Sequence, residues 1–150
     1  AAEHYGKLLA GSWESWAEWR KQNPDESPDF SGEYLSKQNL SSYDLEGADF
    51  SGARLGNAVF AGANLNGAKF SGAEAQGADF TGASLNCADF GGANLEDASF
   101  SGAEIQGANF AGASLKNAAF EGARIEGANF SGAETEGCDL GKAAATNGGP

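Results

Sequence analysis

The sequence predicts an all-β solenoid with a short N-terminal α-helical cap, and three observations support this fold class. A five-residue pattern repeats over most of the chain. Proline, which a ladder that uses every backbone N–H excludes, occurs only outside the repeats, as Pro24, Pro28 and Pro150. Apolar residues before the repeats have the three- and four-residue spacing of a helix. The 150 residues therefore divide into a cap and linker (1–29), a repeat solenoid (30–140) and a tail (141–150).

Each five-residue unit begins with an alanine and has an apolar residue at its centre. Eighteen consecutive units, from Ala48 to Ala133, start with alanine, and their central residues alternate between Phe and a smaller residue that is mostly Leu or Ile. A period of five fits neither the 3.6 residues of a helical turn nor the two of a flat strand, so the chain must turn at every unit. Small polar residues and glycine at the other positions favour such turns. Stacking the turns would bury a continuous apolar column.

Units such as ADFSG, ANLNG and ANFAG resemble the repeats of the pentapeptide-repeat proteins. The resemblance covers about residues 30–140 and implies a right-handed quadrilateral β-helix with four units in each coil. Residues twenty apart would then lie above one another, about 4.8 Å apart. Two columns of phenylalanine, starting at Phe50 and Phe60, would occupy opposite inner faces. The units between Phe30 and Leu45 lack the inward alanine, so we expect the first coil to be less regular.

Residues 3–20 are expected to cover the N-terminal end of the solenoid as an amphipathic helix interrupted by two glycines. Its apolar stripe consists of Tyr5, Leu8, Leu9, Trp13, Trp16 and Trp19. A tryptophan-rich groove for a ligand or partner is the alternative interpretation. Residues 21–28 should form a turn and linker. The C-terminal tail is too small to seal the far end, which leaves either a loosely lying tail or a homodimer through the C-terminal end.

The chain has few of the groups that catalysis uses. His4 is the only histidine, so neither a Ser/His/Asp triad nor a histidine-based metal site can be built. Cys87 and Cys138 should lie roughly 12 Å apart along the axis, too far for a disulfide. Two free thiols favour a reducing compartment such as the cytoplasm. We therefore predict no enzyme activity, no cofactor and no metal site.

The chain is strongly acidic. Nine Lys and Arg against 21 Asp and Glu give a net charge of -12, which opposes direct binding to nucleic acid or an anionic membrane. No apolar run reaches the roughly 18 residues of a membrane-spanning helix. We predict a rod-like scaffold that binds an unidentified protein partner. The most acidic side of the predicted coil is the candidate partner surface, with Glu74, Glu96, Asp97, Glu134 and Glu136.

The resemblance supplies a second functional hypothesis. Some pentapeptide-repeat proteins imitate duplex DNA, bind type II topoisomerases such as DNA gyrase and confer quinolone resistance. Residues 30–140 carry 15 acidic and 5 basic residues, on a rod of roughly 27 Å, and a duplex of that length carries about 16 charges. Those relatives are longer dimeric rods with a C-terminal helix and contact loops, and we expect neither a helix in residues 141–150 nor a loop that interrupts the repeats. The N-terminal Trp and Asn-Pro pattern is also similar to that of short cyanobacterial members, most of which have no assigned activity.

Overall fold

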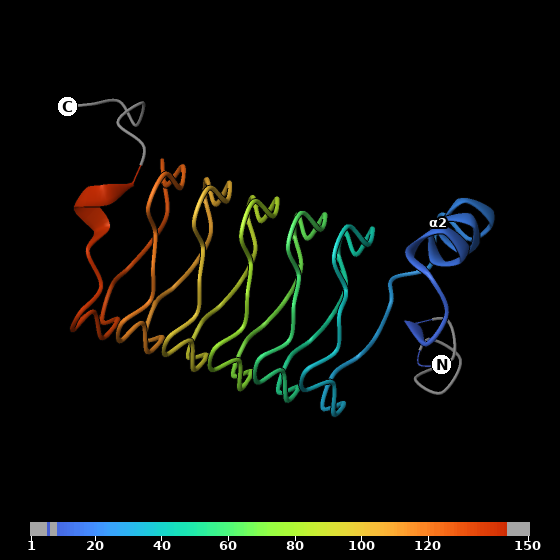
Figure 1. Ribbon diagram of the computed structural model, residues 1–150, viewed down its shortest axis with the longest axis horizontal. Coiled ribbons are helices and arrows are strands. Elements are labelled where there is room, and N and C mark those ends of the chain that lie inside the picture. Colours follow the sequence, from blue (N-terminus) through green and yellow to red (C-terminus); the bar gives the residue numbers. More distant parts are fainter. Residues whose placement is uncertain (1–5, 7–8, 144–150) are drawn as a thin grey trace.

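The computed structural model describes residue 6 and residues 9–143. Its named helices are α2, Trp13–Gln22, and the 3-10 helix η1, Leu140–Lys142. Between them the chain winds into a stack of coils, with α2 at one end and η1 at the other (Figure 1). Parallel bridges join residues that are twenty apart, from Asp29↔Asp49 to Ser114↔Glu134. Among the described residues these bridges stay isolated, and no strand of several consecutive residues forms, because a turn interrupts every unit.

A tight turn closes each unit. In the unit around Phe50, Ala53 N–H donates to Phe50 O at 3.0 Å, and Gly52 between them has a φ of 66°. The turn requires left-handed backbone at this position, which explains why glycine dominates there. Six units accommodate another residue, with φ between 59° and 66°: Lys37, Ser42, Asn57, Cys87, Asp97 and Asn117.

The Asp or Asn that often precedes the core residue supports the same turn. Asp49 Oδ1 accepts a hydrogen bond from Ser51 N–H at 2.9 Å, and Asn109 Oδ1 accepts one from Ala111 N–H at 2.9 Å. Such bonds from a side chain to the backbone two residues ahead hold the chain in the turn. The repeated Ala-Asx-apolar sequence therefore specifies a corner, a turn support and a core residue in that order.

Hydrogen bonds between coils fix the register at twenty residues. Phe50 N–H donates to Lys69 O at 2.7 Å, and Lys69 N–H donates back to Ala48 O at 2.9 Å. The same pair of bonds recurs up the stack, so each coil has four sides of one unit each. We number the sides by their core residues. Side 1 contains Phe30, Phe50, Phe70, Phe90, Phe110 and Phe130; side 2 contains Leu35, Leu55, Ala75, Leu95, Leu115 and Thr135; side 3 contains Leu40, Phe60, Phe80, Phe100 and Phe120; side 4 contains Leu45, Leu65, Leu85, Ile105 and Ile125.

The two predicted phenylalanine columns fill the core. Within a column the rings stack, as Phe50 and Phe70 do with centroids 5.0 Å apart and an interplanar angle of 7°. Across the core the rings meet edge to face, as Phe50 and Phe60 do at 5.5 Å and 79°. Both arrangements are favourable for aromatic pairs. The corner alanines from Ala48 to Ala123 are also buried, so the interior of these coils is occupied by hydrocarbon.

The backbone of the first coil is as regular as that of the later coils, so the expectation of irregularity was wrong. All four of its bridges to the second coil form, from Asp29↔Asp49 to Asp44↔Asn64. The ladder bonds use backbone groups alone, including the carbonyls of the corner residues Glu33, Gln38 and Tyr43, so the side chain at the corner does not decide the register. Tyr43, which replaces a corner alanine, is 4% exposed and donates its hydroxyl to Leu9 O at 3.2 Å.

The helix α2 begins at Trp13 and ends at Gln22, not at residue 20 as expected. The Ser12 side chain accepts a hydrogen bond from Ser15 N–H at 3.1 Å and starts the helix there. Trp16 is fully buried, with its ring 6.0 Å from that of Phe30, whereas Trp13 is 48% exposed. The prediction that Trp13 belongs to the buried apolar stripe is therefore wrong. This first residue of the helix lies beyond the contact between α2 and the first coil. Tyr5 and Leu8 lie outside the described residues.

Two side chains of α2 take the place of a preceding coil. Trp16 Nε1 donates to Asp44 O at 2.7 Å, and Arg20 Nη2 donates to Glu46 O at 3.0 Å. One coil later, the equivalent carbonyls of Asn64 and Asn66 accept backbone N–H groups from the first coil. The α2 side chains thus satisfy acceptors that a further coil would otherwise occupy.

Candidate interaction surface

The acidic residues predicted as a partner surface share side 2. Glu74, Asp97, Glu134 and Glu136 are exposed, and Glu96 is half-exposed. From Glu74 to the C-terminal end of side 2, these five carboxylates share that side with one cation, Lys116. No other side concentrates charge in this way over the same coils. There, side 1 has Lys69 and Asp89, side 3 has Asp79, Glu121, Asp139 and Lys142, and side 4 has Glu104, Arg124 and Glu126.

Most of this acidic surface has no neutralising partner among the described residues. Lys116 Nζ lies 3.7 Å from Glu136 Oε1, and both side chains are well exposed, so this pair contributes little stability. Ser114 Oγ donates to Glu96 Oε2 at 3.4 Å. Within the described part of the chain, no Lys or Arg lies within ion-pair distance of Glu74, Glu96, Asp97 or Glu134. A field of uncompensated negative charge therefore covers the C-terminal coils of side 2.

The N-terminal coils of side 2 have the opposite character, which sequence reasoning missed. Tyr34 is 71% exposed, and the Arg54 guanidinium lies 5.9 Å from the centre of its ring. Lys37 is exposed on the same side. The sequence signal that could have revealed this end of side 2 was Tyr34, a large aromatic residue at an outward position that otherwise holds polar or small residues. Side 2 thus carries two cations, Lys37 and Arg54, against one carboxylate, Glu33, at its N-terminal end and is acidic at its C-terminal end.

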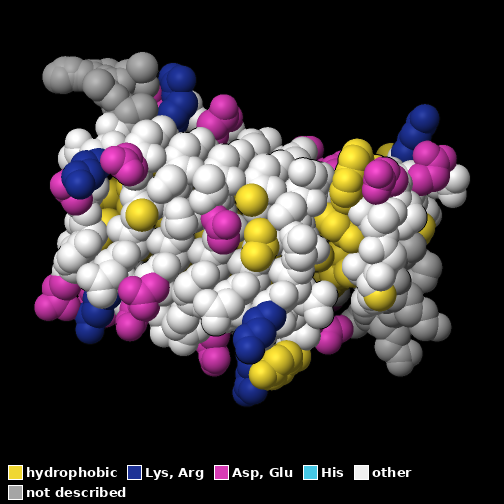
Figure 2. Space-filling view, in the orientation of Figure 1, with side chains coloured by type: hydrophobic (Ala, Val, Ile, Leu, Met, Phe, Trp, Pro, Cys, Tyr) yellow, Lys and Arg dark blue, Asp and Glu magenta, His cyan; other side chains and the backbone are white. Residues whose placement is uncertain are grey.

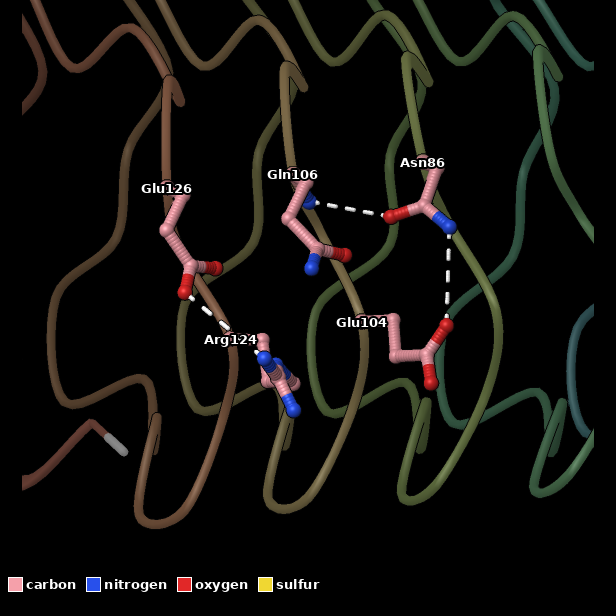
Figure 3. Close-up of polar contacts among 5 residues, drawn as sticks. All are labelled: Asn86, Glu104, Gln106, Arg124 and Glu126. Carbon is pink, nitrogen blue, oxygen red and sulfur yellow. Dashed lines mark hydrogen bonds and ion pairs between the residues drawn. The ribbon is translucent and has the colours of Figure 1, made fainter. Parts of the chain in front are cut away.

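Side 4 carries a ladder of amides instead of a charged field (Figure 3). Asn86 Oδ1 accepts a hydrogen bond from Gln106 N–H at 3.1 Å, and Asn86 Nδ2 donates to Glu104 Oε1 at 3.5 Å. Arg124 and Glu126 approach to 3.9 Å in the next coil. The unit around Ile105 has Glu104 at the position where other units have the Asp or Asn that supports the turn. The side chain of Asn86, one coil earlier, therefore accepts the hydrogen bond from Gln106 N–H. We assign these contacts to stability.

Two hollows on the surface are lined by described residues. A hollow of about 200 Å³ at the C-terminal end is lined by Asn117, Ala118, Ala119, Phe120, Glu121, Gly137, Asp139 and Lys142. One of about 270 Å³ beside α2 is lined by Ala17, Arg20, Lys21, Pro24 and Asp44. Neither lining includes a Ser, Thr, Cys or His residue. In the part of the chain that is described, no three His, Cys, Asp or Glu residues are grouped as metal ligands. His4 lies outside that part.

The shifted pKa values belong to structural contacts. The backbone N–H and hydroxyl of Ser31 lower the pKa of Asp29 by donating to its carboxylate. Burial raises the pKa of Tyr43, and the charge of Glu14 adds to the effect. Burial likewise raises the pKa of Cys138, with a further contribution from Asp139. Cys87 and Cys138 are both free thiols, as expected from their separation.

Figure 2 shows one face of the rod, on which acidic and basic side chains are scattered among uncharged groups and several lie next to a side chain of opposite charge. On this face hydrophobic side chains gather mainly where the cap meets the first coil. The described helices include none that is both long enough and apolar enough to cross a membrane.

Solved structures with a similar fold include three informative examples. A trypsin-treated variant of QnrB1, a plasmid-mediated fluoroquinolone resistance protein, has 29% identity and a TM-score of 0.63, covering 78% of this chain and 60% of that one. A pentapeptide repeat protein from the cyanobacterium Cyanothece 51142 has 20% identity and a TM-score of 0.46, covering 85% and 95%. HetL from Nostoc sp. strain PCC 7120, involved in heterocyst differentiation regulation, has 27% identity and a TM-score of 0.31, covering 83% and 64%.

The chain spans less than two thirds of the length of the QnrB1 variant. No curated protein matches it. The profile of the pentapeptide repeats matches in overlapping segments that together cover residues 39–141: 39–74, 63–102, 76–112, 93–132 and 103–141. These residues are the ones that form the four-sided coils described above. The chain belongs to the pentapeptide-repeat family.

Proposed function

We propose that this protein is a non-enzymatic scaffold whose rigid rod binds another protein through side 2. The observation that carries the proposal is the set of five carboxylates, against one lysine, on the C-terminal coils of that side. The partner surface is accordingly basic. Electrostatic complementarity of this kind accelerates association and fixes orientation more than it adds affinity.

The rod supports this function because its surface is held in place by the core. Each outward residue of side 2 is separated from its neighbour in the next coil by the ladder spacing, about 4.8 Å. The backbone between them is tied by bonds such as Leu95 N–H to Ser114 O at 2.8 Å. A partner therefore meets charges whose positions are set before binding, which reduces the ordering cost of association.

The test compares two variants with the same change in net charge. The first, E74Q/D97N/E134Q, neutralises three carboxylates of side 2 that have no ion pair, and the control, E46Q/E104Q/E121Q, neutralises three on sides 3 and 4. Immobilised wild-type protein and both variants are exposed to extract of the source organism, and captured proteins are quantified by mass spectrometry. We expect a partner that the side 2 variant loses at least tenfold and the control retains. Equal capture by both variants would exclude side 2 as the binding surface.

A second candidate function is inhibition of a type II topoisomerase by imitation of DNA. The similarity to QnrB1, a fluoroquinolone resistance protein, together with the acidic rod, favours testing it. A DNA gyrase supercoiling assay at micromolar protein should show inhibition if this function holds. Inhibition that the control variant keeps and the side 2 variant loses would place the enzyme on the same surface. Uninhibited supercoiling would leave the scaffold proposal as the only candidate.

A further inference from the structure

The first two coils of side 2 carry an exposed aromatic side chain. Tyr34 is 71% exposed, whereas the other large apolar side chains of the described coils are buried or partly buried. The Arg54 guanidinium lies over the Tyr34 ring, 5.9 Å from its centre, which is within the range of a cation–π contact. Tyr and Arg are enriched at protein–protein interfaces, where a few such residues contribute most of the binding energy.

The charge of Arg54 is not neutralised by the described part of the chain. A bridge joins Arg54 to Glu74 in the next coil, yet no carboxylate of a described residue lies within ion-pair distance of the guanidinium. The Arg54 side chain donates no hydrogen bond to a described residue either. A guanidinium that an aromatic ring orients, and whose donors are open, is suited to bind a carboxylate through two parallel hydrogen bonds.

Lys37 adds a second cation to this end of side 2. It is exposed, and its backbone N–H donates to Gly56 O at 2.9 Å, which holds its corner against the second coil. Glu33 is the one carboxylate of side 2 in these two coils, and it lies beyond ion-pair distance of both cations. We call Tyr34, Lys37 and Arg54 the Tyr34 patch. The patch carries positive charge on a chain whose net charge is -12.

The Tyr34 patch and the acidic coils lie on one side at fixed separations. Arg54 is two coils from Glu96 and four coils from Glu136. These separations correspond to about 10 and 19 Å along the rod axis at the ladder spacing. A partner that docked in the reversed orientation would place like charges opposite each other at both ends, which is unfavourable. The order of charges on side 2 therefore selects one orientation of the partner.

We propose that the Tyr34 patch is a second docking element of side 2, which binds an acidic segment of the partner protein while the C-terminal coils bind a basic one. The partner then carries Asp or Glu side chains followed, about 10 to 19 Å farther along, by Lys or Arg. A second copy of this chain matches this pattern less well, because side 2 carries six carboxylates against three cations. This inference rests on the proposed function and specifies the chemistry of its partner.

The test uses a labelled peptide, Glu-Glu-Ser-Ser-Lys-Lys-Lys, whose charges span about 10 to 20 Å when it is extended. Fluorescence anisotropy at low ionic strength gives its Kd, and that of a form with glutamines in place of the glutamates, for three proteins. These are the wild type, the patch variant K37Q/R54Q, and the control K69Q/K142Q, which removes two exposed cations from sides 1 and 3. The double-mutant cycle isolates the contact between the glutamates and the patch.

We expect the glutamates to improve Kd at least fivefold more for the wild type than for K37Q/R54Q. The control should show the same glutamate effect as the wild type, within twofold, although it has the same net charge as the patch variant. Tyr34→Phe should keep the glutamate effect and Tyr34→Ala should reduce it, because the ring orients the Arg54 guanidinium.

A glutamate effect that differs by less than twofold between the wild type and K37Q/R54Q would overturn the inference. So would dimerisation of the wild type in analytical ultracentrifugation that K37Q/R54Q abolishes, because a second copy would then occupy the patch. The proposed function has its own readout: the effect of replacing the peptide's lysines with glutamines should be lost in E74Q/D97N/E134Q. If that variant instead keeps the lysine effect while the glutamate effect depends on the patch, the proposed function fails and the carboxylate site at Tyr34 is supported.

Discussion

Replacing one phenylalanine in the middle of the core should cost far more than replacing one at its end. Phe90 is fully buried, stacks on Phe70 at 4.7 Å and on Phe110 at 5.0 Å, and meets Phe80 and Phe100 edge to face at 5.5 and 5.6 Å. Phe90→Ala removes all four ring contacts and leaves a cavity that the fixed ladder cannot close. We expect a loss of about 3 to 5 kcal/mol in the free energy of unfolding.

Phe130 supplies the matched comparison. It stacks only on Phe110, at 5.1 Å, meets Phe120 edge to face at 5.9 Å, and is partly exposed. Phe130→Ala transfers less area to water and opens a gap that solvent already reaches, so we expect a loss of about 1 to 2 kcal/mol. Urea unfolding followed by circular dichroism measures both. Equal losses for the two variants would refute the view that stability comes from contacts on both sides of each coil.

Three further predictions test the turns, the cap and the C-terminal thiol. Gly77→Ala should destabilise the protein by about 1 kcal/mol more than Gly72→Ala in urea unfolding. Both glycines have positive φ, but only at Gly77 would an added Cβ overlap the Asn57 side chain. Adding Asn57→Gly should remove the difference between the two variants. Trp16→Phe keeps most of the buried ring but leaves Asp44 O without its donor, so Tm should fall by several degrees. Amide hydrogen exchange should become faster in the first coil before it does so in the last coil. An equal increase in exchange along all coils would contradict the assignment of α2 as a cap. In a Cys87→Ser background, the raised pKa of Cys138 means less thiolate at a given pH, so iodoacetamide should react more slowly at pH 8 with the folded protein than with the same protein unfolded in urea, and the two rates should approach each other only as the pH rises further; an equal rate at pH 8 would contradict the burial of the thiol.

The register of the coils could be predicted from sequence because every unit repeats the same residue types at the same positions. The twenty-residue spacing that places Phe50 under Phe70 follows from the alternation of Phe and smaller residues together with the four units per coil that the resemblance to the pentapeptide-repeat proteins implies. The five acidic residues of side 2 followed from that register alone, and the structure places them on one side. Where each residue repeats its neighbours, local pattern and global structure agree.

The parts that could not be predicted depend on single contacts between different kinds of structure. The docking of Trp16 and Arg20 onto the carbonyls of the first coil depends on the angle at which α2 crosses the coil, which no periodicity encodes. The exposure of Trp13 follows from the same angle. Tyr43 was the one available signal, because a large residue at an alanine position requires a neighbour such as Leu9 to cover it.

The twenty-residue repeat also limits how the length of this rod can change during evolution. Deleting one whole coil leaves every later residue on its own side, so the aromatic columns and the outward charges remain aligned. Deleting a single unit rotates everything downstream by a quarter turn, brings aliphatic residues under phenylalanines, and carries Glu134 and Glu136 to a different side. Insertions and deletions should therefore be tolerated in multiples of four units, and a lineage that gained or lost one unit would have to find a new partner orientation as well as a new core.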